Sequence, residues 1–370
     1  MDEKSFDMFG PEKIIEVYNP KVGMRGFVVI DNTALGPGKG GIRMTPSVSK
    51  EEVARLARAM TYKNALAELP FGGAKSGIIA NDRELTKTQK KELVVAFSKA
   101  LKGVIPSEYV AAPDMNMGSE EMEWFSKANG SKKACTGKPK KMGGLPHELG
   151  STGYGVMVAT EVAVKHLGKK LSNLTFAVEG FGNVGTFATK FLTEQGAKLV
   201  AVSDSRGCIH DSKGIDYAIL MKIKEETGSV VNYLDKQPIV CPGIISAKAD
   251  ILITAAIPDL IKISDVNKVN AKIIIQGSNI PMTKEVERIL ADKGVLIVPD
   301  IIANAGGVIS SYVEYIGGTE KQMFELVKKK ISKNTLLVLN EAKKRKVIPR
   351  VAAMDIAKKR ILAKCNICKK

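Results

Sequence analysis

The stretch Leu174-Thr-Phe-Ala-Val-Glu-Gly-Phe-Gly-Asn-Val-Gly185 decides the fold. It begins as an apolar strand and continues as a G-x-G-x-x-G turn into a helix expected over 186–195. Gly180 makes the tight turn, Gly182 lets a pyrophosphate approach the backbone, and Gly185 lets helix and strand pack closely. Phosphates sit at such a helix N-terminus, beside Asn183 and Val184. This context predicts a dinucleotide site.

An acidic residue stands where such a site needs one. Asp204 ends the next expected strand, 199–203, nineteen residues after the last glycine of the turn. A carboxylate there accepts a ribose hydroxyl. Ser205 and Arg206 follow directly and suit a 2′-phosphate, so the sequence leaves NAD and NADP both open.

Working outward, the second half of the chain alternates strands and helices. A helix over 152–167 precedes the turn, and further apolar strands fit 251–254, 273–276 and 295–298. This alternation is typical of a parallel α/β sheet. With 370 residues the chain is long enough for two domains. We therefore expect two α/β domains around a cleft: a Rossmann-type dinucleotide domain at 145–334, and a substrate domain at 1–135 completed by C-terminal helices at 335–370.

Three lysines in the first half have small or apolar neighbours. Lys63 lies near the end of a helix that Ser49 caps, Lys75 on a glycine-rich loop after Pro70, and Lys39 in the glycine-rich run 36–41. An apolar pocket removes solvation from an ammonium group and lowers its pKa, so that the lysine can act as a base. Lysines on such turns suit a substrate that carries carboxylates, although turn lysines facing water remain an alternative.

The charge distribution bears on the choice of partner. The net charge is +17, but residues 321–370 hold 16 Lys and Arg against 3 Asp and Glu, a net +13. A solvated helical face explains such a run more simply than a nucleic-acid footprint. We expect no specific nucleic acid and, because no apolar run approaches roughly 18 residues, no membrane partner.

The cysteines and the amino terminus indicate a compartment. The start is charged and lacks the apolar core of a secretory signal. Five scattered cysteines do not form a disulfide framework, so we expect a cytoplasmic protein. Cys365-Asn-Ile-Cys368 has the spacing of half a zinc site, but no second half accompanies it. We expect a reduced tail and no metal.

Taken together, several motifs resemble those of the glutamate/leucine/phenylalanine/valine dehydrogenase family, in order from about residue 20 to residue 340. They are Lys39-Gly-Gly-Ile-Arg, Met60-Thr-Tyr-Lys-Asn, Pro70-Phe-Gly-Gly-Ala-Lys, Ala112-Pro-Asp, Thr136-Gly-Lys-Pro, Gly180-Phe-Gly-Asn-Val-Gly and Asn304-Ala-Gly-Gly-Val. The resemblance implies reversible NAD(P)-dependent oxidative deamination of an L-amino acid to a 2-oxo acid and ammonia. It also implies a homo-oligomer, a hexamer in the family.

The resemblance also implies roles for individual residues. Lys63 matches the lysine that binds the substrate α-carboxylate, and Lys75 matches the catalytic lysine that activates water. Asp114, just past a short apolar strand, matches the acid that shuttles protons to and from the amino group. Positions that line the cofactor side of the cleft are matched by Thr152, Asn279 and Asn304.

The substrate assignment depends on two positions. Glutamate enzymes of the family carry a lysine where Lys39 stands, pairing the side-chain carboxylate, and a serine where Ser311 stands. Leucine and valine enzymes place aliphatic residues at both. We therefore expect L-glutamate, with 2-oxoglutarate and ammonia as products. A leucine- or valine-type enzyme is the alternative, because the amino-terminal segment is short and the loop 145–149 lacks an arginine common in glutamate enzymes. A non-catalytic binding protein on the same fold is a third hypothesis.

Overall fold

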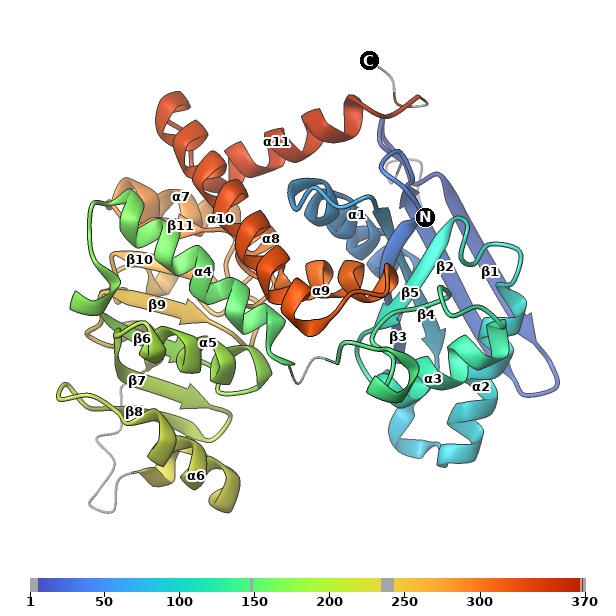
Figure 1. Cartoon of the computed structure of the whole chain (residues 1–370), viewed down its shortest axis with the longest axis horizontal. Coiled ribbons are helices and arrows are strands. Elements are labelled where there is room, and N and C mark those ends of the chain that lie inside the picture. The colour runs from blue at the N-terminus through green and yellow to red at the C-terminus, as the bar shows by residue number, and fades with distance from the viewer. Residues whose placement is uncertain (1–5, 147–148, 234–242, 367, 369–370) are drawn as a thin grey trace. The chain divides into compact units, whose positions relative to one another are not determined.

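The computed structural model describes residues 6–146, 149–233, 243–366 and 368 (Figure 1). The chain forms two compact units. The first comprises Met1–Leu149, Val308–Met323 and Met354–Lys370, and the second comprises Gly150–Gly307 and Phe324–Ala353. The first unit thus takes two separate C-terminal segments, where the sequence analysis places one at 335–370. None of the helices within the described ranges combines the length and apolarity needed to cross a bilayer.

A five-stranded mixed sheet forms the centre of the first unit. Its order is β1-β2-β4-β3-β5. β2 runs antiparallel to both of its neighbours, whereas β3 is parallel to β4 and β5. From its apolar residues the sequence also indicates a strand at 25–31, with 41–44 as its partner. That predicted pairing is wrong, because β4 lies between the two strands. The strands are β1 (Lys13–Asn19), β2 (Met24–Asn32), β3 (Gly38–Thr45), β4 (Gly72–Ile79) and β5 (Tyr109–Pro113).

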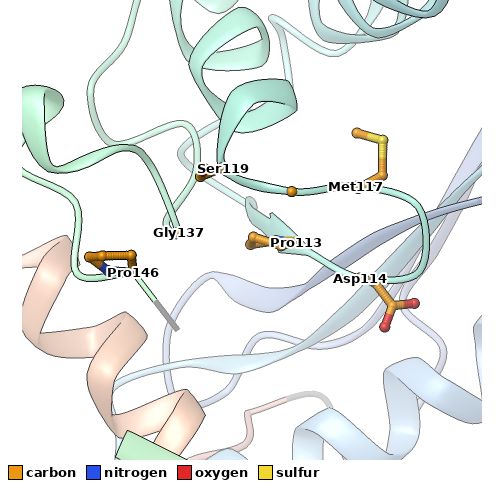
Figure 2. Close-up of a pocket in the computed structure, with 7 residues that line it drawn as sticks. Pro113, Asp114, Met117, Ser119, Gly137 and Pro146 are labelled. Carbon is orange, nitrogen blue, oxygen red and sulfur yellow. The ribbon is translucent and has the colours of Figure 1, made fainter. Parts of the chain in front are cut away.

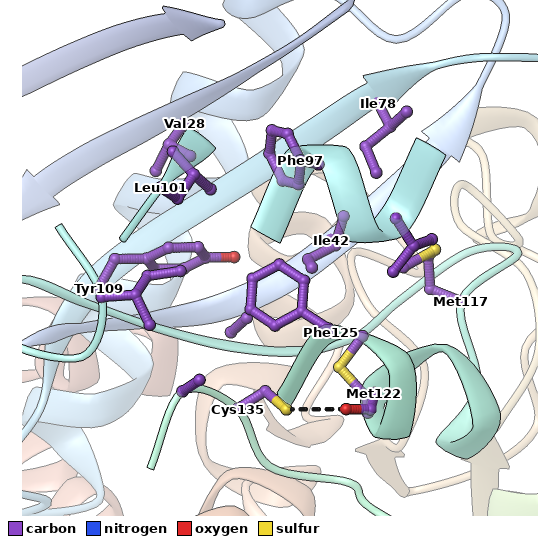
Figure 3. Packing of buried hydrophobic residues seen from close by; sticks show 14 of the residues in the cluster. Val28, Ile42, Ile78, Phe97, Leu101, Tyr109, Met117, Met122, Phe125 and Cys135 are labelled. Atoms are coloured by element: carbon purple, nitrogen blue, oxygen red, sulfur yellow. Dashed lines mark hydrogen bonds between the residues drawn. The ribbon is translucent and has the colours of Figure 1, made fainter. Parts of the chain in front are cut away.

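Alternating side chains of β2 build two cores on opposite faces of this sheet. Phe27 and Val29 pack with Val53 and Ala57 of α1 (Lys50–Leu66). Val28 belongs to a larger cluster with aromatic residues of α2 (Lys87–Ala100) and α3 (Ser119–Asn129), which Figure 3 shows. Helices on both faces hold the sheet rigid, so side chains at its strand ends have fixed positions.

The second unit is a doubly wound sheet of order β11-β10-β9-β6-β7-β8. All pairings are parallel except that of β7 with β8. The chain leaves β6 in one direction and returns to its other side at β9, which is the Rossmann arrangement and places the switch point beside β6. The strands are β6 (Thr175–Glu179), β7 (Lys198–Asp204), β8 (Gly207–His210), β9 (Ile251–Thr254), β10 (Ile273–Gln276) and β11 (Leu296–Val298).

The remaining helices connect these strands or follow them. They are α4 (Ser151–His166), α5 (Asn183–Glu194), α6 (Tyr217–Thr227), α7 (Lys284–Asp292), α8 (Asp300–Ala303), α9 (Gly306–Tyr315), α10 (Glu320–Arg345) and α11 (Pro349–Leu362). The expected helix at 152–167 and the expected strands at 251–254 and 273–276 are confirmed to within a residue.

The C-terminal cysteines differ from expectation. Cys365 and Cys368 form a disulfide, so the prediction of a reduced tail is wrong. The turn after α11 brings their Cα atoms to 5.5 Å, within the range that a disulfide spans. Both cysteines are buried beside Asn32, whose amide donates to Cys368 Sγ at 3.6 Å.

Candidate functional site

Lys75 and Asp114 lie in contact, 3.2 Å apart between Nζ and Oδ2. Lys75 is on β4 and Asp114 follows β5, with β3 running between the two strands. A Cβ atom on Gly41 of β3 would lie 2.8 Å from Asp114 Cβ and 3.2 Å from Lys75 Nζ. Glycine at 41 therefore leaves the space through which the lysine reaches the carboxylate. The loop expected around Lys75 is in fact a strand.

The electrostatics of this pair suit proton transfer. Burial lowers the pKa of Lys75, and Asp114 opposes the shift only in part. For Asp114, burial acts to raise the pKa, but Lys75 and Arg43 outweigh it and hold the pKa below its usual range. Arg43 donates from Nε to Asp114 Oδ2 at 2.8 Å. A lysine that loses its proton readily thus stands beside a carboxylate that stays ionised.

Lys39 is the most deeply buried cation of the first unit's described part. It is 1% exposed, and its Nζ donates to Ala111 O at 2.7 Å. Burial lowers its pKa to about 7, and the nearby charge of Glu314 acts in the opposite direction. Among the described residues no carboxylate lies within ion-pair distance of Lys39. A buried ammonium without a carboxylate suits an anionic ligand.

Two further predicted substrate residues belong to the same unit. Lys63 lies in the last turn of α1 and Ser311 on α9, and both side chains are half-buried. The amide of Asn64 donates to Gly72 O at 2.6 Å and so fixes the end of α1 against the start of β4.

A pocket of about 400 Å³ opens beside Asp114 (Figure 2). Its lining comes from the end of β5, the turn before α3 and the loop around Gly137. Glu314 holds that loop, because its carboxylate accepts from the backbone N–H groups of Gly137 and Leu145 at 2.9 Å and pairs with Lys138. The pocket is large enough for an amino acid. Residues 147 and 148 of the loop that lacks the arginine lie outside the described residues.

The glycine turn of the second unit has the geometry that its spacing predicts. Gly180 adopts φ +86°, and a Cβ there would lie 2.4 Å from Ala256 Cβ. A Cβ on Gly185 would lie 1.8 Å from Gly180 O, so helix and strand meet at van der Waals distance. Gly182 has open space around it and begins α5 without a side-chain cap. The first N–H groups of α5, from Asn183 and Val184 onward, suit a phosphate.

Asp204 is held by four protein donors. Oδ1 accepts from Arg206 N at 2.9 Å and Ser229 Oγ at 3.1 Å, whereas Oδ2 accepts from Lys224 Nζ at 2.6 Å and Val230 N at 2.8 Å. Burial acts to raise its pKa, but these donors, Lys224 foremost, lower it to about 2. Four donors fill the lone pairs of a carboxylate. Ser205, next to it, is exposed.

Asn279 and Asn304 are in direct contact. Asn304 Nδ2 donates to Asn279 Oδ1 at 3.0 Å and to Gly277 O at 3.2 Å. Asn304 is buried, and no described residue donates to its Oδ1. A buried acceptor without a donor is costly unless a ligand supplies one. Thr152 lies on α4 and packs against Gly307, three residues after Asn304, since a Cβ atom on Gly307 would lie 3.0 Å from Thr152 Oγ1.

The predicted residues thus form two groups. Lys39, Lys63, Lys75, Asp114 and Ser311 all belong to the first unit, whereas every predicted cofactor residue from Thr152 to Asn304 belongs to the second. Among the described residues, no three His, Cys, Asp or Glu side chains gather as metal ligands.

Sequence reasoning missed three residues of these groups. Arg43 contacts Asp114. It could have been found from its position two residues after Gly41, which places both residues on the same face of β3. Glu179 ends β6 and accepts from the N–H groups of Ala255 and Ala256 at 2.9 and 3.0 Å. Lys224, twenty residues from Asp204, had no local signal.

Comparison with known proteins gives consistent relatives. A family model described as "Glu/Leu/Phe/Val dehydrogenase, dimerisation domain" matches residues 11–130, and one described as "Glutamate/Leucine/Phenylalanine/Valine dehydrogenase" matches residues 143–366. Glutamate dehydrogenase of Aeropyrum pernix is 42% identical over 83% of this chain and 77% of its own. NADP-specific glutamate dehydrogenase of Saccharolobus shibatae is 38% identical over 82% and 75%.

One solved structure is similar along the full length of the chain. Hetero-hexameric glutamate dehydrogenase from Thermus thermophilus, in a leucine-bound form, superposes with a TM-score of 0.87 at 26% identity, covering 100% of this chain and 93% of its own. Two family models span most of the sequence, and one relative is 42% identical over 83% of it. The chain therefore belongs to the glutamate/leucine/phenylalanine/valine dehydrogenase family.

Proposed function

We propose that this chain is a glutamate dehydrogenase, which converts L-glutamate and water to 2-oxoglutarate and ammonia while reducing NAD or NADP. The observation that carries the proposal is Lys39. It is a buried ammonium with a backbone carbonyl as its acceptor, in the unit that also holds the Lys75–Asp114 pair. A γ-carboxylate would neutralise it, whereas an aliphatic side chain would leave it unpaired at a cost of several kcal/mol.

The first unit's residues divide the work on the substrate. In the proposal Lys39 binds the γ-carboxylate and Lys63 the α-carboxylate, so that the α-carbon is oriented. After the α-carbon has lost its hydride, the substrate is an iminium. Lys75 in its neutral form then takes a proton from water, whose oxygen attacks the iminium carbon. The ionised Asp114 takes a proton from the substrate ammonium before the hydride leaves, and returns it to the nitrogen of the water adduct. The C–N bond then breaks, ammonia leaves, and the hydroxyl proton passes to Asp114 as the carbonyl forms.

The second unit fits a dinucleotide. The open space at Gly182 and the N-terminus of α5, which has no side-chain cap, suit a pyrophosphate. The buried Oδ1 of Asn304, to which no described residue donates, suits the amide donor of a nicotinamide. Bound NAD or NADP supplies the hydride acceptor at C4 of its nicotinamide. We propose that Asn279, Asn304 and Thr152 orient that end, and that the turn Gly180–Gly185 holds the phosphates.

An absorbance assay at 340 nm tests the proposal. L-glutamate, L-leucine, L-valine and L-norleucine are each supplied with NAD and with NADP, and Lys75→Ala serves as the inactive control. We expect L-glutamate to have the highest kcat/KM. A higher kcat/KM for leucine or valine would favour the branched-chain alternative. Absence of any dinucleotide reduction, together with no oxidation in reverse with 2-oxoglutarate and ammonia, would favour the non-catalytic hypothesis.

The edge of the cofactor site at Asp204 bears on NAD against NADP. Its carboxylate already accepts four hydrogen bonds, so a ribose hydroxyl must displace one of them. Lys224 and Arg206 add positive charge at the same edge. We infer that this edge tolerates a 2′-phosphate and that NADP is accepted alongside NAD.

We further propose a homo-oligomer, a hexamer, in the cytoplasm. The family model over residues 11–130 is described as a dimerisation domain, and β1 forms one edge of that unit's sheet, with Tyr18 66% exposed. Light scattering coupled to size exclusion tests the assembly, since six copies of 39.9 kDa give about 240 kDa. A monomer at micromolar concentration would contradict it.

A further inference from the structure

A buried ionic cluster in the second unit is built from residues other than those proposed to contact substrate or dinucleotide. Arg350, at the start of α11, donates from Nε to both carboxylate oxygens of Glu287 at 2.8 Å. Its Nη2 donates to Gln276 Oε1 at 2.6 Å, and its Nη1 pairs with Asp300 Oδ1 at 2.9 Å. Glu287, Asp300 and Gln276 are all buried. One guanidinium thus joins α7, α8 and the end of β10.

Two partners of Arg350, Asp300 and Gln276, are tied in turn to the loop after β10. Asp300 Oδ2 accepts from Ile280 N at 2.8 Å, and Asp300 N donates to Gln276 Oε1 at 3.0 Å. Gln276 is followed directly by Gly277, whose carbonyl accepts from Asn304. The loop 277–280 is therefore held at both of its ends by groups that Arg350 contacts.

The same contacts fix the two asparagines. Asn279 lies inside the loop 277–280, and Asn304 follows α8, the helix that begins at Asp300. The two amides are hydrogen bonded at 3.0 Å. A shift of Asp300 would move Ile280, which follows Asn279 directly. It would also move the start of α8, the helix that Asn304 follows.

We propose that Arg350 is a positioning residue that holds Asn279 and Asn304 in the arrangement that the nicotinamide end of the dinucleotide requires. The proposal rests on the proposed function, which assigns these asparagines to the cofactor. A planar guanidinium reaches three partners at once, which the single ammonium of a lysine does not. Without Arg350, the carboxylates of Glu287 and Asp300 are buried with no cation between them. Their repulsion and lost pairing favour a rotation of the Asp300 side chain away from Ile280 N.

The test compares Arg350→Lys, Arg350→Met and the double variant Arg350→Met with Glu287→Gln. The double variant removes one of the two unpaired buried charges, so its melting temperature should recover in part, but Asp300 still lacks its guanidinium. Arg288→Met on α7 is the matched control, because Arg288 is an exposed arginine on the helix that carries Glu287 and takes no part in the cluster. The readouts are melting temperature, the dissociation constant for NADPH or NADH from nucleotide fluorescence, and KM for glutamate and for the dinucleotide.

We expect binding of the dinucleotide to weaken about 10- to 100-fold in both single variants and in the double variant, as small misplacements of positioned groups typically cost. KM for glutamate should stay within about twofold, since its proposed ligands belong to the other unit. Recovery of both stability and dinucleotide affinity in the double variant would overturn the proposal, as would normal affinity in folded Arg350→Lys. A parent chain that binds dinucleotide but oxidises no amino acid would instead contradict the proposed function, and the binding series would still decide the role of Arg350.

Discussion

Replacing Lys39 with leucine is expected to move the substrate preference from glutamate to an unbranched apolar amino acid such as norleucine. In the variant the γ-carboxylate would be desolvated against an alkyl group. Truncating one partner of a buried charge pair costs about 2–5 kcal/mol, or roughly 30- to several thousand-fold in kcat/KM. The fold should tolerate the change, because Ala111 O, which accepts from Lys39, also accepts from Thr136 N at 3.0 Å.

The pH dependence of the parent adds an independent measurement. Burial lowers the pKa of Lys39 to about 7, so the ammonium form is present below that pH and is lost as the pH rises through it. Because kcat/KM reports the free enzyme, its value for glutamate should fall about tenfold per pH unit well above 7 relative to that for norleucine. Contributions of Lys75 and Asp114 affect both substrates and cancel in the ratio.

The assay is therefore the ratio of kcat/KM for glutamate to that for norleucine, measured from pH 6 to pH 9 in the parent, in Lys39→Leu and in the surface control Lys127→Leu. The parent and the control should show a falling ratio, whereas Lys39→Leu should show a low ratio that does not change with pH. Ser311→Val should lower the ratio further, and non-additively if both residues contact one side chain. An unchanged ratio in Lys39→Leu would refute the assignment of Lys39 and leave the branched-chain alternative.

Other substitutions test the remaining parts of the site. Lys75→Ala should lower kcat by at least roughly 10²–10⁴-fold with dinucleotide affinity unchanged, and Asp114→Asn should do the same; a change in KM alone for Asp114→Asn would make it a binding residue. Gly41→Ala should abolish turnover by separating that pair, while Gly103→Ala, which meets no atom within 4 Å, should be active; equal activities would exclude the steric role. Lys224→Met should reduce kcat/KM for NADP about tenfold more than for NAD, as loss of a charge-assisted bond implies, and equal losses would place the 2′-phosphate elsewhere.

The second unit was largely predictable because its signals are local. The turn Gly180–Gly185 joins a strand to a helix within a dozen residues, and each glycine has a separate steric reason that follows from the spacing alone. The ends of β7 and β10 also follow from continuous apolar runs, as buried parallel strands require. What the sequence did not reveal was Lys224 at Asp204, a contact between elements that no period or motif connects.

The first unit was harder to predict because several of its glycines lie within strands β3 and β4 and not in turns. A Cβ on Gly73 would lie 2.1 Å from Thr61 Oγ1 and one on Gly72 would lie 1.8 Å from Asn32 O. These glycines let α1 and β2 pack against β4, so the residues that resemble a loop in sequence form a central strand. The pairing of Arg43 with Asp114, 71 residues apart, likewise depends on the order of the strands. The predicted order was wrong, because it placed β3 directly beside β2.

The divided first unit has a consequence for the order in which a nascent chain can fold. Lys138 is buried against Glu314, and the last carbonyls of α1, on Ala65 and Leu66, accept from Arg360 at 3.2 and 2.6 Å. Residues up to 149 leave the ribosome before either partner exists, so they emerge with Lys138 lacking Glu314 and the Leu66 carbonyl lacking its Arg360 donor. The half of the molecule that is synthesised first is therefore completed last, once α9 and α11 have been made.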